Sequence, residues 1–202
     1  MTADPKTASP PSGPHPNRSA MNANKLTDFP VDRPHENCYW VVPGRFLAGE
    51  YPGAYRPTGA YLRLQAYLRA GISSFLDLTH PNDGLAPYAA ILADAGKVLN
   101  VPTDYRRLPI PDMSVPSHAQ MVAILDTIDA ALAGGARIYV HCWGGIGRTG
   151  TVVGCYLVRH GLTGNAALAQ LATWWQGVEK SSRNPRSPET DAQVAMIRQW
   201  AE

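Results

Sequence analysis

The chain has 202 residues, 45% of them hydrophobic, which is enough for the core of one domain. Charged residues make up only 17% and the formal net charge is +2, whereas nucleic-acid-binding proteins carry a strongly basic face or tail. The chain has three cysteines, which predicts no disulfide framework. It has no secretory signal, and no apolar run approaches the roughly 18 residues that span a bilayer. We therefore expect a cytoplasmic protein with no nucleic-acid partner and no membrane partner.

Residues 1–30 are predicted to be a disordered N-terminal tail, and the folded domain is expected over residues 31–202. The tail is rich in proline, and Leu26 and Phe29 are nearly its only large apolar residues, so little surface is available to offset the entropy of ordering. It is either a regulatory segment or an inert extension, with Met21 as an alternative start.

The first half of the domain alternates strand and helix patterns. Apolar, β-rich runs that flank turns or follow glycine predict four strands, over residues 39–42, 45–48, 72–78 and 105–108. Apolar residues at helical spacing predict two helices, one over 58–70 before Gly71 and one over 85–95 that ends at Gly96.

The second half begins with the clearest helix, over residues 117–133, where Ser117 and Gln120 have capping-box spacing. A strand over 137–141 follows. Three further helices are expected, from Arg148 onward, over 163–176, and over 188–200 with Pro188 at the first helical position. This alternation predicts a single α/β domain with a central, mostly parallel β-sheet flanked by helices.

The stretch from His141 to Gly150 is the most informative segment of the chain. It places Cys142 six positions before Arg148, and three of the five intervening residues are glycines. A loop that leads from a strand into a helix aims several backbone N–H groups and the positive end of the helix dipole at one point, which makes an anion site. The loop residues are Trp143, Gly144, Gly145, Ile146, Gly147 and Arg148.

The same field favours the thiolate form of Cys142, and Arg148 can bind two oxygens of a phosphate with its planar guanidinium. The alternative for Cys142 is an ordinary buried cysteine. The glycines are expected to tolerate the unusual backbone dihedrals of such a cradle.

Attack on a phosphate ester also needs a proton for the leaving oxygen, and Asp112 is the best candidate. It stands in a proline-bounded loop after a predicted strand, and loops on a rigid scaffold often carry catalytic groups. The alternative is a turn or cap residue. Asp104 is the nearest rival, whereas Asp77 lies within a strand, and Asp126 and Asp129 face out of a helix.

The segment from His141 to Gly150 resembles the HC-x5-R-[ST] motif of the cysteine-dependent protein tyrosine phosphatase superfamily. Asp112, thirty positions before Cys142, resembles the general-acid loop of the small dual-specificity branch. The segments 45–52 and 187–193 resemble the first strand region and the late glutamine loop of that branch. The resemblance covers roughly residues 39–200.

The resemblance implies a phosphatase of protein tyrosine phosphatase-like fold that needs no metal and no cofactor. Cys142 would be the nucleophile, Arg148 would bind phosphate, and Asp112 would be the general acid. Supporting roles are implied for three more residues: His141 would position the loop, Thr149 would hydrogen-bond the thiolate, and Gln193 would orient the hydrolytic water.

The expected substrates are phosphotyrosine and, beyond it, phosphoserine or phosphothreonine in proteins, or small phosphate esters. The loop carries no lysine between Cys142 and Arg148, whereas lipid phosphatases of the superfamily usually have lysines there. Lys180, Arg183 and Arg186 would either supply charge at the rim or form a solvated turn. The alternatives are a phospho-binding pseudophosphatase, a phosphoinositide phosphatase, or a cysteine enzyme of sulfur transfer or arsenate reduction.

Overall fold

The computed structural model describes residues 32–202, so the predicted tail over residues 1–30 lies outside the described residues. Its centre is a five-stranded sheet in the order β1-β2-β5-β3-β4. All neighbouring strands are parallel except β1 and β2, which form an antiparallel pair. The strands are β1 Cys38–Val42, β2 Phe46–Gly49, β3 Ser74–Asp77, β4 Asp104–Arg107 and β5 Ile138–His141. The expected mostly parallel α/β fold is therefore confirmed.

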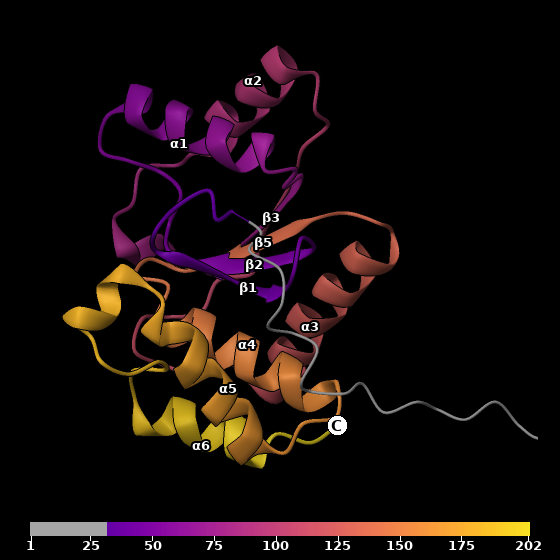
Figure 1. Cartoon of the computed structure of the whole chain (residues 1–202), viewed down its shortest axis with the longest axis vertical. Coiled ribbons are helices and arrows are strands. Elements are labelled where there is room, and N and C mark those ends of the chain that lie inside the picture. The colour runs from indigo at the N-terminus through magenta and orange to yellow at the C-terminus, as the bar shows by residue number, and fades with distance from the viewer. Residues whose placement is uncertain (1–31) are drawn as a thin grey trace, which may run out of the picture.

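Helices cover both faces of the sheet (Figure 1). One face carries α1 Pro57–Arg69 and α2 Ala89–Leu99. The other carries α3 His118–Ala133, α4 Gly147–Arg159, α5 Gly164–Gln176 and α6 Asp191–Gln199. Two short 3-10 helices, η2 Pro81–Asp83 and η3 Glu179–Ser182, lie in the connecting loops. No helix within residues 32–202 is long and apolar enough to cross a membrane.

The strands supply one apolar layer to each face, because successive side chains of a strand point to opposite sides. In β5, Tyr139 packs with α1 and α2, whereas Ile138 and Val140 pack with the other four helices. In β2, Leu47 likewise packs with α1 and α2, whereas Phe46 packs with the other four helices. The central strands are thus buried on both sides, as a parallel sheet requires.

Three predicted helix ends are wrong, and the first is the start of the helix predicted over 85–95, which begins at Ala89. The helix predicted over 85–95 does not end at Gly96 but continues to Leu99 and ends at Asn100 in the left-handed conformation. Gly96 is there for packing, since a Cβ would lie 2.8 Å from a Thr103 methyl group and from the Val101 carbonyl oxygen. The last helix begins at Asp191 rather than Pro188, because Thr190 and Gln193 form a reciprocal capping box.

Two leucines in α1 can test how this helix packs against the sheet, because only one of them is buried. Leu64 is fully buried and Leu62 is 61% exposed. We expect Leu64→Ala to lower the free energy of unfolding by about 2–5 kcal/mol, since it leaves a cavity. Leu62→Ala should change it by no more than about 0.5 kcal/mol. Equal losses in urea unfolding of the two variants would contradict this packing.

Candidate active site

The loops at one edge of the sheet converge on the cysteine loop. Strands β2, β5, β3 and β4 run parallel, so Gly49, His141, Asp77 and Arg107 end at the same edge. In open α/β sheets this carboxyl edge is the usual place for ligands. The segment 142–146 leaves β5 there and enters α4, which begins at Gly147. The predicted strand–loop–helix arrangement is thus confirmed.

The first two residues of the loop differ in exposure. Cys142 is 2% exposed, whereas Trp143 is 52% exposed at the surface. The carbonyl oxygen of Trp143 accepts a hydrogen bond from the N–H of Tyr51 at 2.9 Å, so the segment after β2 holds the loop.

Only one of the three loop glycines has the unusual dihedrals expected of all three. Gly145 has φ +76°, and a Cβ there would lie 2.5 Å from the carbonyl carbon of Gly49. Gly144 and Gly147 do not have positive φ. A Cβ on Gly144 would meet only Ile146 side-chain atoms at 3.4 Å, whereas one on Gly147 would lie 2.6 Å from the Glu189 carboxylate.

Arg148 is a buried cation shared between two loops. Its Nη1 donates to Asp83 Oδ2 at 2.7 Å and to the Ile110 carbonyl oxygen at 3.1 Å, and its Nη2 lies 2.9 Å from Asp112 Oδ1. Burial acts to lower the pKa of Arg148, but the charges of Cys142 and the two aspartates outweigh it and raise the pKa. The guanidinium therefore stays charged.

Asp83 is a site residue that the sequence analysis missed. Its side chain is 4% exposed, and Oδ2 accepts from Arg148 and from the N–H of His80. The local signal was present, because His80 and Asp83 cap the short helix η2 reciprocally. Nothing in the sequence pairs this loop with Arg148, since 65 residues separate the partners.

The structure brings the predicted acid Asp112 to Arg148, and its side chain remains 50% exposed. Its neighbour Met113 has φ +57°, the left-handed region that a residue other than glycine seldom adopts. Two amides hold this loop: Gln120 Nε2 donates to the Pro109 carbonyl at 2.7 Å, and Gln193 Nε2 donates to the Ser114 carbonyl at 3.1 Å. Gln120 thus caps the acid loop rather than completing a box with Ser117.

His141 is fully buried beneath the loop. Its Nδ1 lies 3.2 Å from the Cys142 carbonyl oxygen, and its Nε2 lies 2.6 Å from the Tyr88 hydroxyl. Burial lowers its pKa, while the Asp77 carboxylate opposes that shift. A neutral ring that carries its proton on Nδ1 can donate to Cys142 and accept from Tyr88. Asp77 itself accepts from Thr79 and Tyr105 and lies within the sheet, as expected.

The two remaining supporting residues have partners other than those expected. The Thr149 hydroxyl lies 3.4 Å from the Gly49 carbonyl oxygen, to which it donates. The Gln193 side chain is fully buried, and its Oε1 accepts from the N–H groups of Glu189 and Thr190 at 3.1 Å. The Gln193 amide therefore joins the late loop to the acid loop.

Basic side chains after α5 divide between the loop and the surface. Lys180 Nζ donates to the Gly144 carbonyl at 3.3 Å and lies 2.5 Å from Glu50 Oε2, so η3 brings a lysine to the loop although none occurs within it. Arg186 instead pairs with Asp191 at the exposed surface. Lys180 is thus the one of these two residues that brings positive charge to the rim of the loop, and it also pairs with Glu50.

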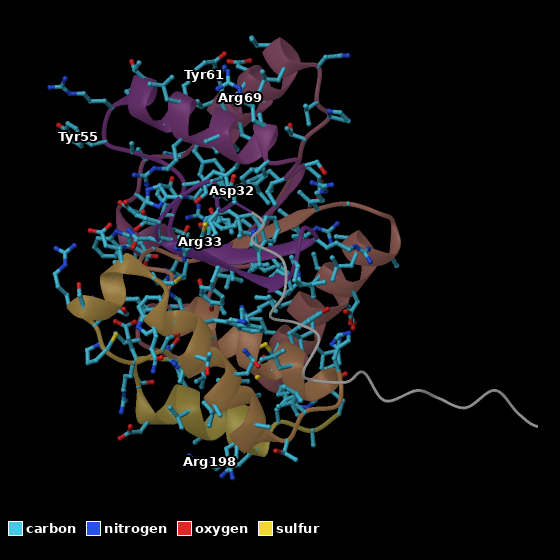
Figure 2. The ribbon with its side chains drawn as sticks, viewed as in Figure 1. Asp32, Arg33, Tyr55, Tyr61, Arg69 and Arg198 are labelled. Carbon is cyan, nitrogen blue, oxygen red and sulfur yellow. The ribbon has the colours of Figure 1, made fainter. Side chains whose placement is uncertain are left out.

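A cleft of about 510 Å³ adjoins the cysteine loop. Trp143, Glu50, Arg63 and Lys180 line it together with Tyr55, which is 99% exposed. Figure 2 shows Tyr55 projecting away from the ribbon at the side of the molecule. The cleft therefore continues from the loop toward solvent.

The other two cysteines, Cys38 and Cys155, are buried thiols within the core. Burial raises the pKa of Cys38 to about 11 and that of Cys155 to about 12. Neither thiol is disposed to act as a nucleophile at neutral pH.

Residues 53–162, just over half of the chain, match a family model described as "Polymorphic toxin system, DSP-PTPase phosphatase". The dual specificity protein phosphatase CDC14B of Mus musculus is 26% identical over 128 residues, which are 60% of this chain and 24% of that protein. The tyrosine-protein phosphatase cdc-14 of Caenorhabditis elegans is 34% identical over 145 residues, 65% of this chain and 18% of that protein. The chain spans about a quarter of the length of the curated relatives that it matches first.

Two solved structures illustrate the shared fold. Tk-PTP in its active form has a TM-score of 0.62 at 22% identity, and the match covers 81% of this chain and 95% of that one. PTPMT1 in complex with PI(5)P has a TM-score of 0.59 at 17% identity, over 80% of this chain and 92% of that one.

The difference between Gly145 and Gly144 can be tested by two alanine substitutions. Gly145→Ala combines a left-handed backbone with a clash against Gly49, and the conformation alone costs roughly 1–2 kcal/mol. We expect it to lower the melting temperature and to abolish sulfate binding. Gly144→Ala, whose Cβ meets only a flexible side chain at 3.4 Å, should retain both. Sulfate binding by the Gly145 variant, measured calorimetrically, would contradict the assigned loop geometry.

The buried pair of Asp83 and Arg148 predicts a stability loss that an anion should relieve. Asp83→Ala leaves the guanidinium short of a partner, and breaking a buried pair costs about 3–5 kcal/mol. Sulfate should restore part of this stability in urea unfolding, because it pairs with Arg148. Asp94→Ala, which breaks an exposed pair with Lys97, is the control and should cost no more than about 1 kcal/mol. An Asp83 variant as stable as this control would overturn the assignment.

Proposed function

Since this chain belongs to the cysteine-dependent DSP-PTPase phosphatase family, we propose that it is a metal-independent phosphatase that hydrolyses phosphate monoesters through a cysteinyl-phosphate intermediate. The observation that carries the proposal is the 2.9 Å contact between Arg148 and Asp112. One guanidinium lies at the end of the anion-binding loop and beside a half-exposed carboxyl group, so the phosphate site and a proton donor adjoin each other.

In the first step the Cys142 thiolate attacks phosphorus and forms an S–P bond. The P–O bond to the substrate alcohol or phenol breaks, and the leaving oxygen takes the proton of Asp112. Arg148 and the loop N–H groups stabilise the charge of the transferring phosphoryl group. In the second step water attacks phosphorus, Asp112 takes a proton from that water, and the S–P bond breaks to release inorganic phosphate and the thiolate.

The surrounding residues support this chemistry by holding the loop. The neutral, buried His141 fixes the Cys142 carbonyl, and Tyr88 fixes His141. Asp83 orients Arg148 without competing with Asp112, because the two carboxylates contact different guanidinium nitrogens. Thr149 is proposed to stabilise the leaving thiolate by turning its hydroxyl from Gly49 to the sulfur.

Phosphorylated protein side chains are the proposed substrates, with phosphotyrosine first and phosphoserine or phosphothreonine beside it. The exposed Trp143 and Tyr55 give the adjoining cleft two aromatic surfaces against which a peptide can pack. One observation favours a phosphoinositide as the second candidate, namely that Lys180 brings a cation to the loop. Its pairing with Glu50 leaves less charge for a polyphosphorylated head group.

A substrate panel with the Cys142→Ser protein as blank tests the reaction. We expect the wild-type protein to release phosphate from an aryl phosphate and a phosphotyrosine peptide faster than from a phosphothreonine peptide or a phosphoinositide. Cys142→Ser should abolish turnover while it still binds sulfate. Turnover by this variant would rule out the covalent mechanism, and a wild-type protein that binds anions without turnover would be a pseudophosphatase.

Asp112→Asn tests the proton donor within the same panel. The rate should fall by roughly 10²–10⁴-fold, since the amide cannot protonate the leaving oxygen. The loss should be greatest for alkyl phosphates, whose leaving groups are poor, and smallest for activated aryl phosphates. Asp104→Asn, which alters the rival carboxylate on β4, serves as the control. An equal loss for all leaving groups would contradict the general-acid role.

A further inference from the structure

A second acidic side chain, Glu189, lies against the start of α4. A Cβ on Gly147 would be only 2.6 Å from Glu189 Oε2, and the Gly147 N–H interacts with this carboxylate. Gly147 is the first residue of α4 and belongs to the loop between Cys142 and Arg148. The carboxylate therefore sits where the loop turns into the helix, beside an N–H group of the anion site.

The backbone of the Glu189 loop is held on several sides, which fixes the direction of its side chain. Ser187 Oγ donates to the Ile146 carbonyl at 2.8 Å, and the buried Gln193 Oε1 accepts from the Glu189 N–H at 3.1 Å. Arg186 Nε donates to the Glu189 carbonyl oxygen at 2.9 Å. The backbone that carries the Glu189 side chain is thus anchored beside the cysteine loop.

Charged groups of both signs face Glu189 from the elements around it. Asp112 of the acid loop repels it, whereas Arg148 of α4 and Lys180 of η3 attract it. Burial is the largest influence and raises the pKa of Glu189, and the charge of Asp112 raises it further. The Gly147 N–H and the two cations act in the opposite direction without cancelling the shift.

We propose that the Glu189 carboxylate is part of the anion site beside Gly147 and that a phosphate group binds there with uptake of one proton by Glu189. The proposal rests on the proposed function, because it makes Glu189 a specificity-determining group of the same site. A dianion beside Arg148 would repel an ionised Glu189 at close range, since both face the same N–H group and the same guanidinium. Once protonated, the carboxyl group donates a hydrogen bond to a phosphate oxygen instead.

The proposal changes the part assigned to the late loop. Gln193, expected to orient the hydrolytic water, has its Oε1 on two backbone N–H groups and its Nε2 on the Ser114 carbonyl. Gln193 is therefore a positioning residue that holds Glu189 and the acid loop together. Glu189 is the member of the loop that meets the anion.

Sulfate binding to the Cys142→Ser protein tests the proposal without turnover, and sulfate stays a dianion from pH 5.5 to 8. If binding requires a protonated Glu189, the dissociation constant for sulfate should rise about tenfold per pH unit above the pKa that Glu189 has in the sulfate-free protein. Glu189→Gln in the same background keeps the shape and removes the titration. We expect the Glu189→Gln variant to take up about one proton fewer than the parent when sulfate binds, as measured by calorimetry over this pH range. It should also bind sulfate more tightly than the parent at pH 8.

Two further variants separate Glu189 from its neighbours. Glu179→Gln removes one exposed carboxylate from η3 and should leave the pH dependence unchanged. Asp112→Asn should retain the pH dependence that Glu189 causes. An unchanged pH dependence in Glu189→Gln, weaker sulfate binding by that variant at every pH, or no sulfate binding by the parent would each overturn the proposal. A protein that shows the expected sulfate pattern but releases no phosphate would retain the Glu189 assignment and lose only the proposed catalysis.

Discussion

The burial of the Arg148 guanidinium is the constraint on which the site depends. A cation that is 2% exposed needs partners for its donors, and it finds them in Asp83, Asp112 and the Ile110 carbonyl. These three groups come from the loops after β3 and β4, whereas Arg148 comes from the helix after β5. The requirement to satisfy one charge therefore brings the loops after β3 and β4 to the start of α4.

The parallel sheet makes this gathering possible. Because β5 lies between β2 and β3, the loop that leaves it is supported on one side by the Gly49–Tyr51 segment and on the other by Asp77 and its neighbours. The contact between Gly145 and Gly49 is close enough to exclude a Cβ. The shape of the anion site is thus set as much by β2 and the turn after it as by the cysteine segment itself.

The sequence could predict what local patterns encode. The helices, apart from three of their ends, the strand before Cys142 and the loop that carries Asp112 were predicted as the structure has them, because each depends on neighbouring residues. Asp83 and Glu189 were missed since their importance lies in contacts across 65 and 42 positions with Arg148 and Gly147. The start of the last helix is also encoded locally, because Thr190 and Gln193 have capping-box spacing. Pro188 predicted a start three residues before Asp191, where the helix begins.

Met113, next to the acid Asp112, has a consequence for which substitutions the acid loop accepts. Its left-handed backbone is one that glycine or asparagine adopts at little cost and that a methionine adopts only when its surroundings enforce it. A glycine would relieve the backbone and at the same time allow the loop more conformations in which the Asp112 carboxyl group leaves Arg148. A substitution that favours thermal stability at this position would therefore loosen the contact between Asp112 and Arg148.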